Sequence, residues 1–324
     1  MPETLDSHFR TVVRATLDGR LIPLLGAGVN LSGRPSGASW EIGSYDSLPS
    51  GGELASYLAS HFDYPAADPQ QVADLVRVAQ YVAVMEGPGP LYEQLRRVFD
   101  GDYEPSPVHR LFASLPATLR RQQGTTNYQL LVTTNYDDVL ERALRSAGEE
   151  FDVVSYIAEG DARGKFFHLR PNGEVVLIEV PNRYGELNLE QRTVVLKIHG
   201  AVDRIDEERD SFVITEDHYI DYLTRTDIAK LVPATLTAKL QRSHFLFLGY
   251  SMRDWNLRVI LHRIWGQQRL KYNSWAVQLD PEPIDRRYWS TRGVEILNRR
   301  LDEYVNTLAG YFGFDMAGPN GDRP

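Results

Sequence analysis

Hydrophobic and polar positions follow two patterns along this chain. Runs that are almost entirely apolar occur at 21–25, 129–133, 193–198 and 244–248, which is typical of strands buried on both faces of a sheet. Longer segments between these runs carry apolar residues three or four positions apart, which predicts amphipathic helices. Strands that alternate with helices indicate an α/β fold, in which a parallel sheet is covered by helices on both faces.

Weaker signals of the same kind predict the remaining elements. Further strands are expected at 151–157, 165–169, 174–180, 274–279 and 293–297. Further helices are expected at 4–18, 137–147, 216–223, 233–242, 253–265 and 301–313.

The region 53–121 differs from the rest because it is helical throughout. It predicts helices at 53–62, 69–85, 89–99 and 107–121, separated by proline and glycine. We interpret it as an inserted helical subdomain. Residues 1–52 and 122–314 then form the α/β domain, and residues 315–324 form a flexible tail.

Composition excludes several classes of protein. The 324 residues carry a net charge of −9, which argues against nucleic acid as a direct ligand. No apolar run approaches the roughly 20 residues that span a bilayer, and the first residues lack the apolar stretch of a signal peptide, so we expect a cytoplasmic protein with no membrane segment. The chain has no cysteine, which excludes disulfides, thiolate catalysis and a four-cysteine zinc site.

Unusual residues collect at the ends of four predicted strands. They occupy 26–30, 134–137, 199–200 and 249–251, each directly after an apolar run. Ligands of open α/β sheets bind at the carboxyl ends of the strands. The sequence therefore predicts that these four loops lie along one edge of the sheet and form a site together.

The first loop is a glycine turn, which lets backbone N–H groups approach a pyrophosphate closely. It contains Gly26, Ala27 and Gly28. The dehydrogenase fingerprint would have its third glycine at Leu31, whereas this chain offers Gly33, so that fingerprint fits poorly. A tight turn without a ligand is the alternative interpretation.

The second loop joins a strand to a helix. Asn135 could orient a water or hydroxyl group at a sugar, and Asp137 could bind a carboxamide. The alternative is helix capping, for which Asp138 and Glu141 have the spacing of a capping box. Each interpretation accounts for these residue types when the loop is considered alone.

The third and fourth loops have similar alternatives. His199 could accept a proton near neutral pH, but a single histidine at a strand end is commonly structural. Ser251 or Asp254 could cap the following helix. We find no motif of zinc proteases, P-loop enzymes or serine hydrolases, and no paired-histidine spacing that indicates a metal.

The four loops together resemble the Sir2 (sirtuin) superfamily, and more closely the bacterial SIR2-like proteins of antiphage defence. The resemblance lies in GAGVN with the following GRP, in TTNYDDVLERAL, in LKIHGAVDR and in GYSMRDWNLRVIL. It covers about residues 20–310, apart from most of the helical insertion. It implies a Rossmann-like sheet that binds NAD.

The resemblance also implies roles for single residues. Asn135 and His199 match the family's catalytic asparagine and histidine, and Asp137 matches the residue that holds the nicotinamide carboxamide. The other residues implied to contact NAD are Gly26, Ala27, Gly28, Asn30, Thr134, Gly249, Ser251 and Asp254.

Two departures from protein-deacylating sirtuins favour NAD⁺ hydrolysis to nicotinamide and ADP-ribose. The four-cysteine zinc module is absent, and the connection from Asp137 to His199 carries extra β-rich sequence. The alternatives are an NAD-dependent deacylase, an ADP-ribosyltransferase and a non-catalytic NAD or ADP-ribose sensor. The resemblance further implies a homo-oligomer and a separate activating partner, of ATPase or Argonaute type.

Overall fold

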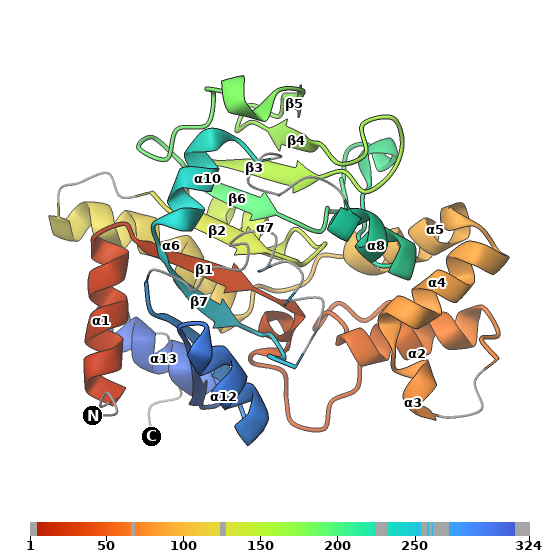
Figure 1. The fold of residues 1–324 in the computed structure, drawn as a ribbon, viewed down its shortest axis with the longest axis horizontal. Helices are drawn as coiled ribbons and strands as arrows, with labels where there is room; N and C mark the ends of the chain where they lie inside the picture. Colours follow the sequence, from red (N-terminus) through yellow and green to blue (C-terminus); the bar gives the residue numbers. More distant parts are fainter. Residues whose placement is uncertain are drawn as a thin grey trace.

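The computed structural model describes residues 5–65, 69–123, 128–224, 232–253, 258, 261 and 272–314. Within this part of the chain, nine strands form one sheet in the order β5-β4-β3-β6-β2-β1-β7-β8-β9 (Figure 1). The strands are β1 (Leu21–Leu25), β2 (Leu130–Thr133), β3 (Phe151–Tyr156), β4 (Phe166–Leu169), β5 (Val175–Ile178), β6 (Thr193–Lys197), β7 (His244–Leu248), β8 (Ser274–Gln278) and β9 (Val294–Asn298). The predicted Rossmann-like α/β fold is confirmed.

Strand direction departs from the expected parallel sheet at one edge only. Seven neighbouring strands from β3 to β9 are parallel, whereas β4 runs antiparallel to both β3 and β5. A short turn at 170–174 joins β4 to β5, and a short turn can only reverse the chain into an antiparallel neighbour. Parallel pairing would have needed a longer crossover.

Helices occupy most of the segments predicted to be helical. They are α1 (Leu5–Leu17), α2 (Gly51–His61), α3 (Pro69–Val72), α4 (Leu75–Met85), α5 (Pro88–Phe99), α6 (Pro107–Gln123), α7 (Val139–Ser146), α8 (Glu216–Thr224), α10 (Ala234–Gln241), α12 (Pro283–Thr291) and α13 (Leu301–Tyr311). Three short 3₁₀ turns are η1 (Ala27–Leu31), η2 (Pro181–Arg183) and η3 (Glu207–Arg209). No helix in the described ranges is long and apolar enough to cross a membrane.

Two helical predictions need correction. The helix expected at 69–85 is divided, because the Asp74 side chain accepts a hydrogen bond from the Arg77 amide (3.2 Å) and starts a new helix. Helix α12 was not predicted. Most of the helix expected at 253–265, and the tail 315–324, lie outside the described residues.

Apolar cores cover the two faces of the sheet. On one face α1, α6, α7 and α13 contribute a core that includes Phe9, Phe112, Leu144 and Leu308. On the other face α8, α10 and α12 contribute a second core, and α10 crosses in front of β3 and β6 (Figure 1). The sheet is therefore fixed from both sides, which holds its strand ends in place.

A third core lies beyond the carboxyl ends of the strands, where α2, α4 and α5 pack together (Figure 1). It contains Leu58, Val82 and Leu95, and it reaches the α/β part through Phe212. Helix α6 packs on the sheet instead, through residues such as Phe112. Within 53–121, only the helices before α6 thus share the third core, and the proposed domain boundaries stay a prediction.

Candidate functional site

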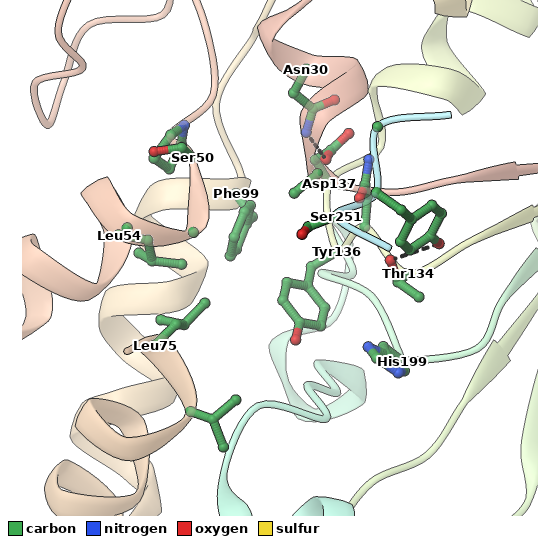
Figure 2. Close-up of a pocket in the computed structure, with 18 of the residues that line it drawn as sticks. Asn30, Ser50, Leu54, Leu75, Phe99, Thr134, Tyr136, Asp137, His199 and Ser251 are labelled. Carbon is green, nitrogen blue, oxygen red and sulfur yellow. Dashed lines mark hydrogen bonds between the residues drawn. The ribbon is translucent and has the colours of Figure 1, made fainter. Parts of the chain in front are cut away.

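A cleft of about 570 Å³ lies between the strand ends and helices α2 and α4 (Figure 2). The four loops singled out in the sequence meet there. The predicted site residues that line the cleft are Ala27, Asn30, Thr134, Asn135, Asp137, His199, Gly249 and Ser251. Gly26 and Gly28 lie in the turn against Gly249, and Asp254 is outside the described residues.

The glycine turn after β1 packs directly on the turn after β7. The Gly28 amide donates to the Gly249 carbonyl (2.9 Å), and the Gly26 amide donates to the Leu248 carbonyl (2.9 Å). A Cβ at Gly28 would lie 2.8 Å from the Gly249 oxygen, closer than real Cβ contacts. Backbone packing therefore accounts for these glycines, and Ala27 is the member of the triplet that lines the cleft. A role for this turn in pyrophosphate binding stays a proposal.

Asp137 is held rigidly and is only 3% exposed. One carboxylate oxygen accepts from the Asn30 side-chain amide (3.0 Å), and the other accepts from the Val139 amide (3.1 Å) at the start of α7. The side-chain oxygen of Asn30 is buried, and it has no hydrogen-bond partner among the described residues. This part of the cleft thus presents an acceptor that a bound ligand could satisfy.

Asn135 belongs to the second loop, and its side chain connects that loop to the first. Its backbone amide donates to the Thr133 hydroxyl (3.0 Å), and its side-chain amide donates to the Gly26 carbonyl (3.3 Å). The side chain is buried, and it lines the same cleft as Asp137. This arrangement fixes a side-chain carboxamide at the point where β1 and β2 end.

The capping box proposed as an alternative for this loop does not form. Asp138 is the residue before α7, but its side chain makes no capping bond. It pairs with Arg142 (3.0 Å) and Arg204 (2.8 Å), while Glu141 pairs with Lys197 (2.8 Å). The interpretation as a capping box was wrong because ion pairs take both carboxylates, with Arg204 and Lys197 as partners that are distant in sequence.

His199 is buried at the end of β6, with 4% of its surface exposed. Its ring packs edge-on against Tyr219 of α8, and Nε2 has no hydrogen-bond partner in the described part of the chain. Burial lowers the pKa of the imidazole to about 3. The ring is therefore neutral at pH 7, and in this buried state it is a weaker base than a free imidazole.

Because the pKa of His199 is lowered in the folded protein, we expect the protein to lose stability in acid. The unfolded chain binds the proton near pH 6.5 and the folded chain only near pH 3, so stability is lost as pH falls through that window. Between pH 6.5 and 5, we expect wild type to lose about 2 kcal/mol more than His199→Gln. Denaturant unfolding at both pH values measures this difference. Equal losses in the two proteins would contradict it.

Residues to which the sequence analysis gave no role complete the cleft. Tyr250 hydroxyl lies 3.0 Å from the Thr134 hydroxyl and donates to the Leu25 carbonyl (3.0 Å), which ties three strand ends together. Leu54 and Leu75 face Thr134 and His199 across the cleft (Figure 2). In the sequence, an apolar helix residue that lines a cleft looks the same as one that is buried in a core.

Within the described ranges, no group of three or more histidine, aspartate or glutamate residues is placed to hold a metal ion. The polar groups that line the cleft include amides, carboxylates, an imidazole and hydroxyls.

Comparison with protein families agrees with this arrangement. A family model described as a SIR2-like domain matches residues 129–297, more than half of the chain. The chain belongs to the SIR2-like family. The matched region contains the second, third and fourth loops of the SIR2-like cleft, and the first loop precedes it.

This SIR2-like chain matches only part of the length of each similar protein. The NAD(+) hydrolase ThsA of Acinetobacter baumannii is 31% identical over 198 residues, which are 61% of this chain and 32% of the relative. ThsA of Enterococcus faecium is 31% identical over 199 residues, 61% of this chain and 33% of the relative. Defense-associated sirtuin 2 of Bacillus subtilis is 22% identical over 299 residues, 89% of this chain and 24% of the relative. The chain thus spans about a third or less of these relatives.

Proposed function

We propose that this SIR2-like chain hydrolyses NAD⁺ to nicotinamide and ADP-ribose and acts as an antiphage effector that depletes NAD⁺. The observation that carries the proposal is the meeting of Asn135, Asp137 and His199 in one strand-end cleft beside the glycine turn. Its volume of about 570 Å³ lies within the range of small-molecule sites. The similar proteins named NAD(+) hydrolase support the hydrolysis, and the one named a defense-associated sirtuin supports the role in defence.

The reaction needs few groups because nicotinamide is a good leaving group. Its ring nitrogen is cationic in NAD⁺, so the bond between that nitrogen and the ribose breaks readily. Asp137 holds the carboxamide of nicotinamide, and Asn135 holds the attacking water at the ribose. His199 accepts a proton from that water or from a ribose hydroxyl, a contribution of roughly 10²–10⁴-fold. Positioning and charge stabilisation supply the remainder.

We expect water to be the acceptor, because the four-cysteine zinc module of protein-deacylating sirtuins has no counterpart in a chain without cysteine. The wall that faces the polar strand ends carries Leu54, Leu75 and Phe99 (Figure 2), together with Ser50 and Asp74. Activation then comes from homo-oligomerisation or from a separate partner, of ATPase or Argonaute type.

Incubation with NAD⁺ alone tests the proposal. The chain is mixed with NAD⁺, with and without an acyl-lysine peptide, and nicotinamide and ADP-ribose are separated by chromatography. We expect both products in equal amounts and no dependence on the peptide. Thermal unfolding with and without NAD⁺ provides a second measurement. Absence of both turnover and stabilisation by NAD⁺ would reject the proposal.

We expect this activity to be independent of zinc. The chain has no cysteine to supply thiolate ligands. Treatment with a chelator should leave both the unfolding temperature and NAD⁺ turnover unchanged, and metal analysis should find no stoichiometric zinc. A chelator-sensitive activity that zinc restores would contradict this expectation.

A further inference from the structure

A buried lysine lies directly behind the loop that carries Asn135 and Asp137. Lys197 is the last residue of β6 and is 1% exposed, in a strand that is otherwise apolar apart from Thr193. Its ammonium group donates to the main-chain carbonyl of Asp137 (2.5 Å) and to a carboxylate oxygen of Glu141 (2.8 Å). Both acceptors belong to the segment from the loop into α7.

Stability alone does not account for this ion pair. Glu141 is buried, and its second carboxylate oxygen has no hydrogen-bond partner among the described residues. Burying two charges has a desolvation cost that the attraction between them often fails to offset, and apolar residues of similar size commonly give equal or greater stability. The feature that apolar residues could not reproduce is the hydrogen bond to Asp137.

Asp137 is consequently held from two opposite directions. On the cleft side its carboxylate accepts from Asn30, and on the far side its carbonyl accepts from Lys197. A second cavity, also of about 570 Å³, is lined by Lys197, Glu141 and Asp138. The Lys197 ammonium is thus a buried charged group that holds the Asp137 carbonyl from behind the loop.

We propose that Lys197 is a positioning residue that fixes the loop 134–137, and through it aligns Asn135 and Asp137 on the nicotinamide ribose. This proposal rests on the proposed function for its effect on turnover. Lys197 is not among the residues that line the cleft, whereas Thr134, Asn135 and Asp137 of the loop in front of it are.

Three variants separate positioning from stability. Lys197→Met removes both hydrogen bonds and leaves Glu141 buried as an unpaired carboxylate. Lys197→Met/Glu141→Met replaces the whole ion pair by apolar groups, which restores packing without restoring the bond to Asp137. The matched control is Lys239→Met, since Lys239 is a partly buried lysine that donates to the Gly19 carbonyl at the amino end of the sheet.

Three measurements are made on each protein. Amide hydrogen exchange of residues 134–139 without NAD⁺ reports the loop directly, thermal unfolding reports stability, and steady-state kinetics with NAD⁺ report kcat and KM. We expect the double variant to recover stability while these amides exchange roughly tenfold or more faster than in wild type. With NAD⁺, its kcat should stay about 10²-fold low, with KM changed less, because misplaced groups lose transition-state contacts. Lys239→Met should change neither exchange nor kcat.

Each alternative result decides the proposal. If the double variant recovers stability together with wild-type exchange and wild-type kcat, the pair is structural and the proposal is overturned. If neither Lys197 variant folds, the pair is again structural. If wild type neither cleaves NAD⁺ nor is stabilised by it, the proposed function fails, but the exchange measurement still decides whether Lys197 fixes the loop.

Discussion

Asn135→Ala and His199→Ala are each expected to lower NAD⁺ turnover by at least about 10²-fold. Asn135 places the nucleophile that His199 helps to activate, so either loss removes the same transition-state arrangement. The double variant should therefore be little slower than either single variant. Initial rates of nicotinamide release under activating conditions measure all three.

Stability has to be measured beside these rates. Asn135 donates one long hydrogen bond to the Gly26 carbonyl (3.3 Å), so its loss should cost about 1 kcal/mol at most. His244→Ala is a suitable control, because it removes a histidine from the amino end of β7, at the opposite end of the sheet from the cleft. A stable Asn135→Ala protein that hydrolyses NAD⁺ at the wild-type rate would falsify the proposed mechanism.

Gly249→Ala is expected to destabilise the protein by roughly 3 kcal/mol or more and to abolish NAD⁺ binding. The residue has a φ of +75°, and an added Cβ would lie 2.4 Å from the Val29 amide nitrogen and 2.8 Å from the Gly26 oxygen. The methyl group would separate the two turns that meet under the cleft. Denaturant unfolding and NAD⁺-induced thermal stabilisation measure the two effects.

Gly148→Ala provides the matched control for that prediction. Gly148 has nearly the same backbone conformation, with a φ of +73°, but an added Cβ would meet nothing within 4 Å. It should cost only about 1–2 kcal/mol and leave NAD⁺ binding intact. Equal effects from the two substitutions would show that backbone strain, and not the contact between turns, explains the glycine at 249.

The central strands could be predicted from sequence because each is a nearly continuous apolar run. The pattern at 21–25 and at 244–248 allows little besides a strand buried on both faces. Helix α12 gave no such signal. The side of this helix that faces the core is anchored largely by Trp289, whose indole donates to the Met252 carbonyl (2.8 Å). A single long-range anchor of this kind leaves no periodicity to detect.

The cleft, like the fold, could be predicted only in part from the sequence. Residues such as Asn135 and His199 could be found because they follow apolar strands whose carboxyl ends must lie at one edge. Lys197 and Glu141 could not, because their pairing depends on the packing of α7 against β6. The role of Tyr250 could not be predicted either, since its hydrogen bonds reach strands that only the folded sheet brings near.

The contact between the turns at Gly28 and Gly249 also sets when the cleft can first exist during synthesis. Strand β1 ends at Leu25, yet its neighbour β7 begins only at His244. At ribosomal rates of about 5–20 residues per second, β7 emerges on the order of 10 s or more after β1. A nascent chain that stops before β7 lacks the Gly249 turn and so has no complete cleft. A chain that cleaved NAD⁺ at this cleft would therefore stay inactive on the ribosome until β7 had emerged.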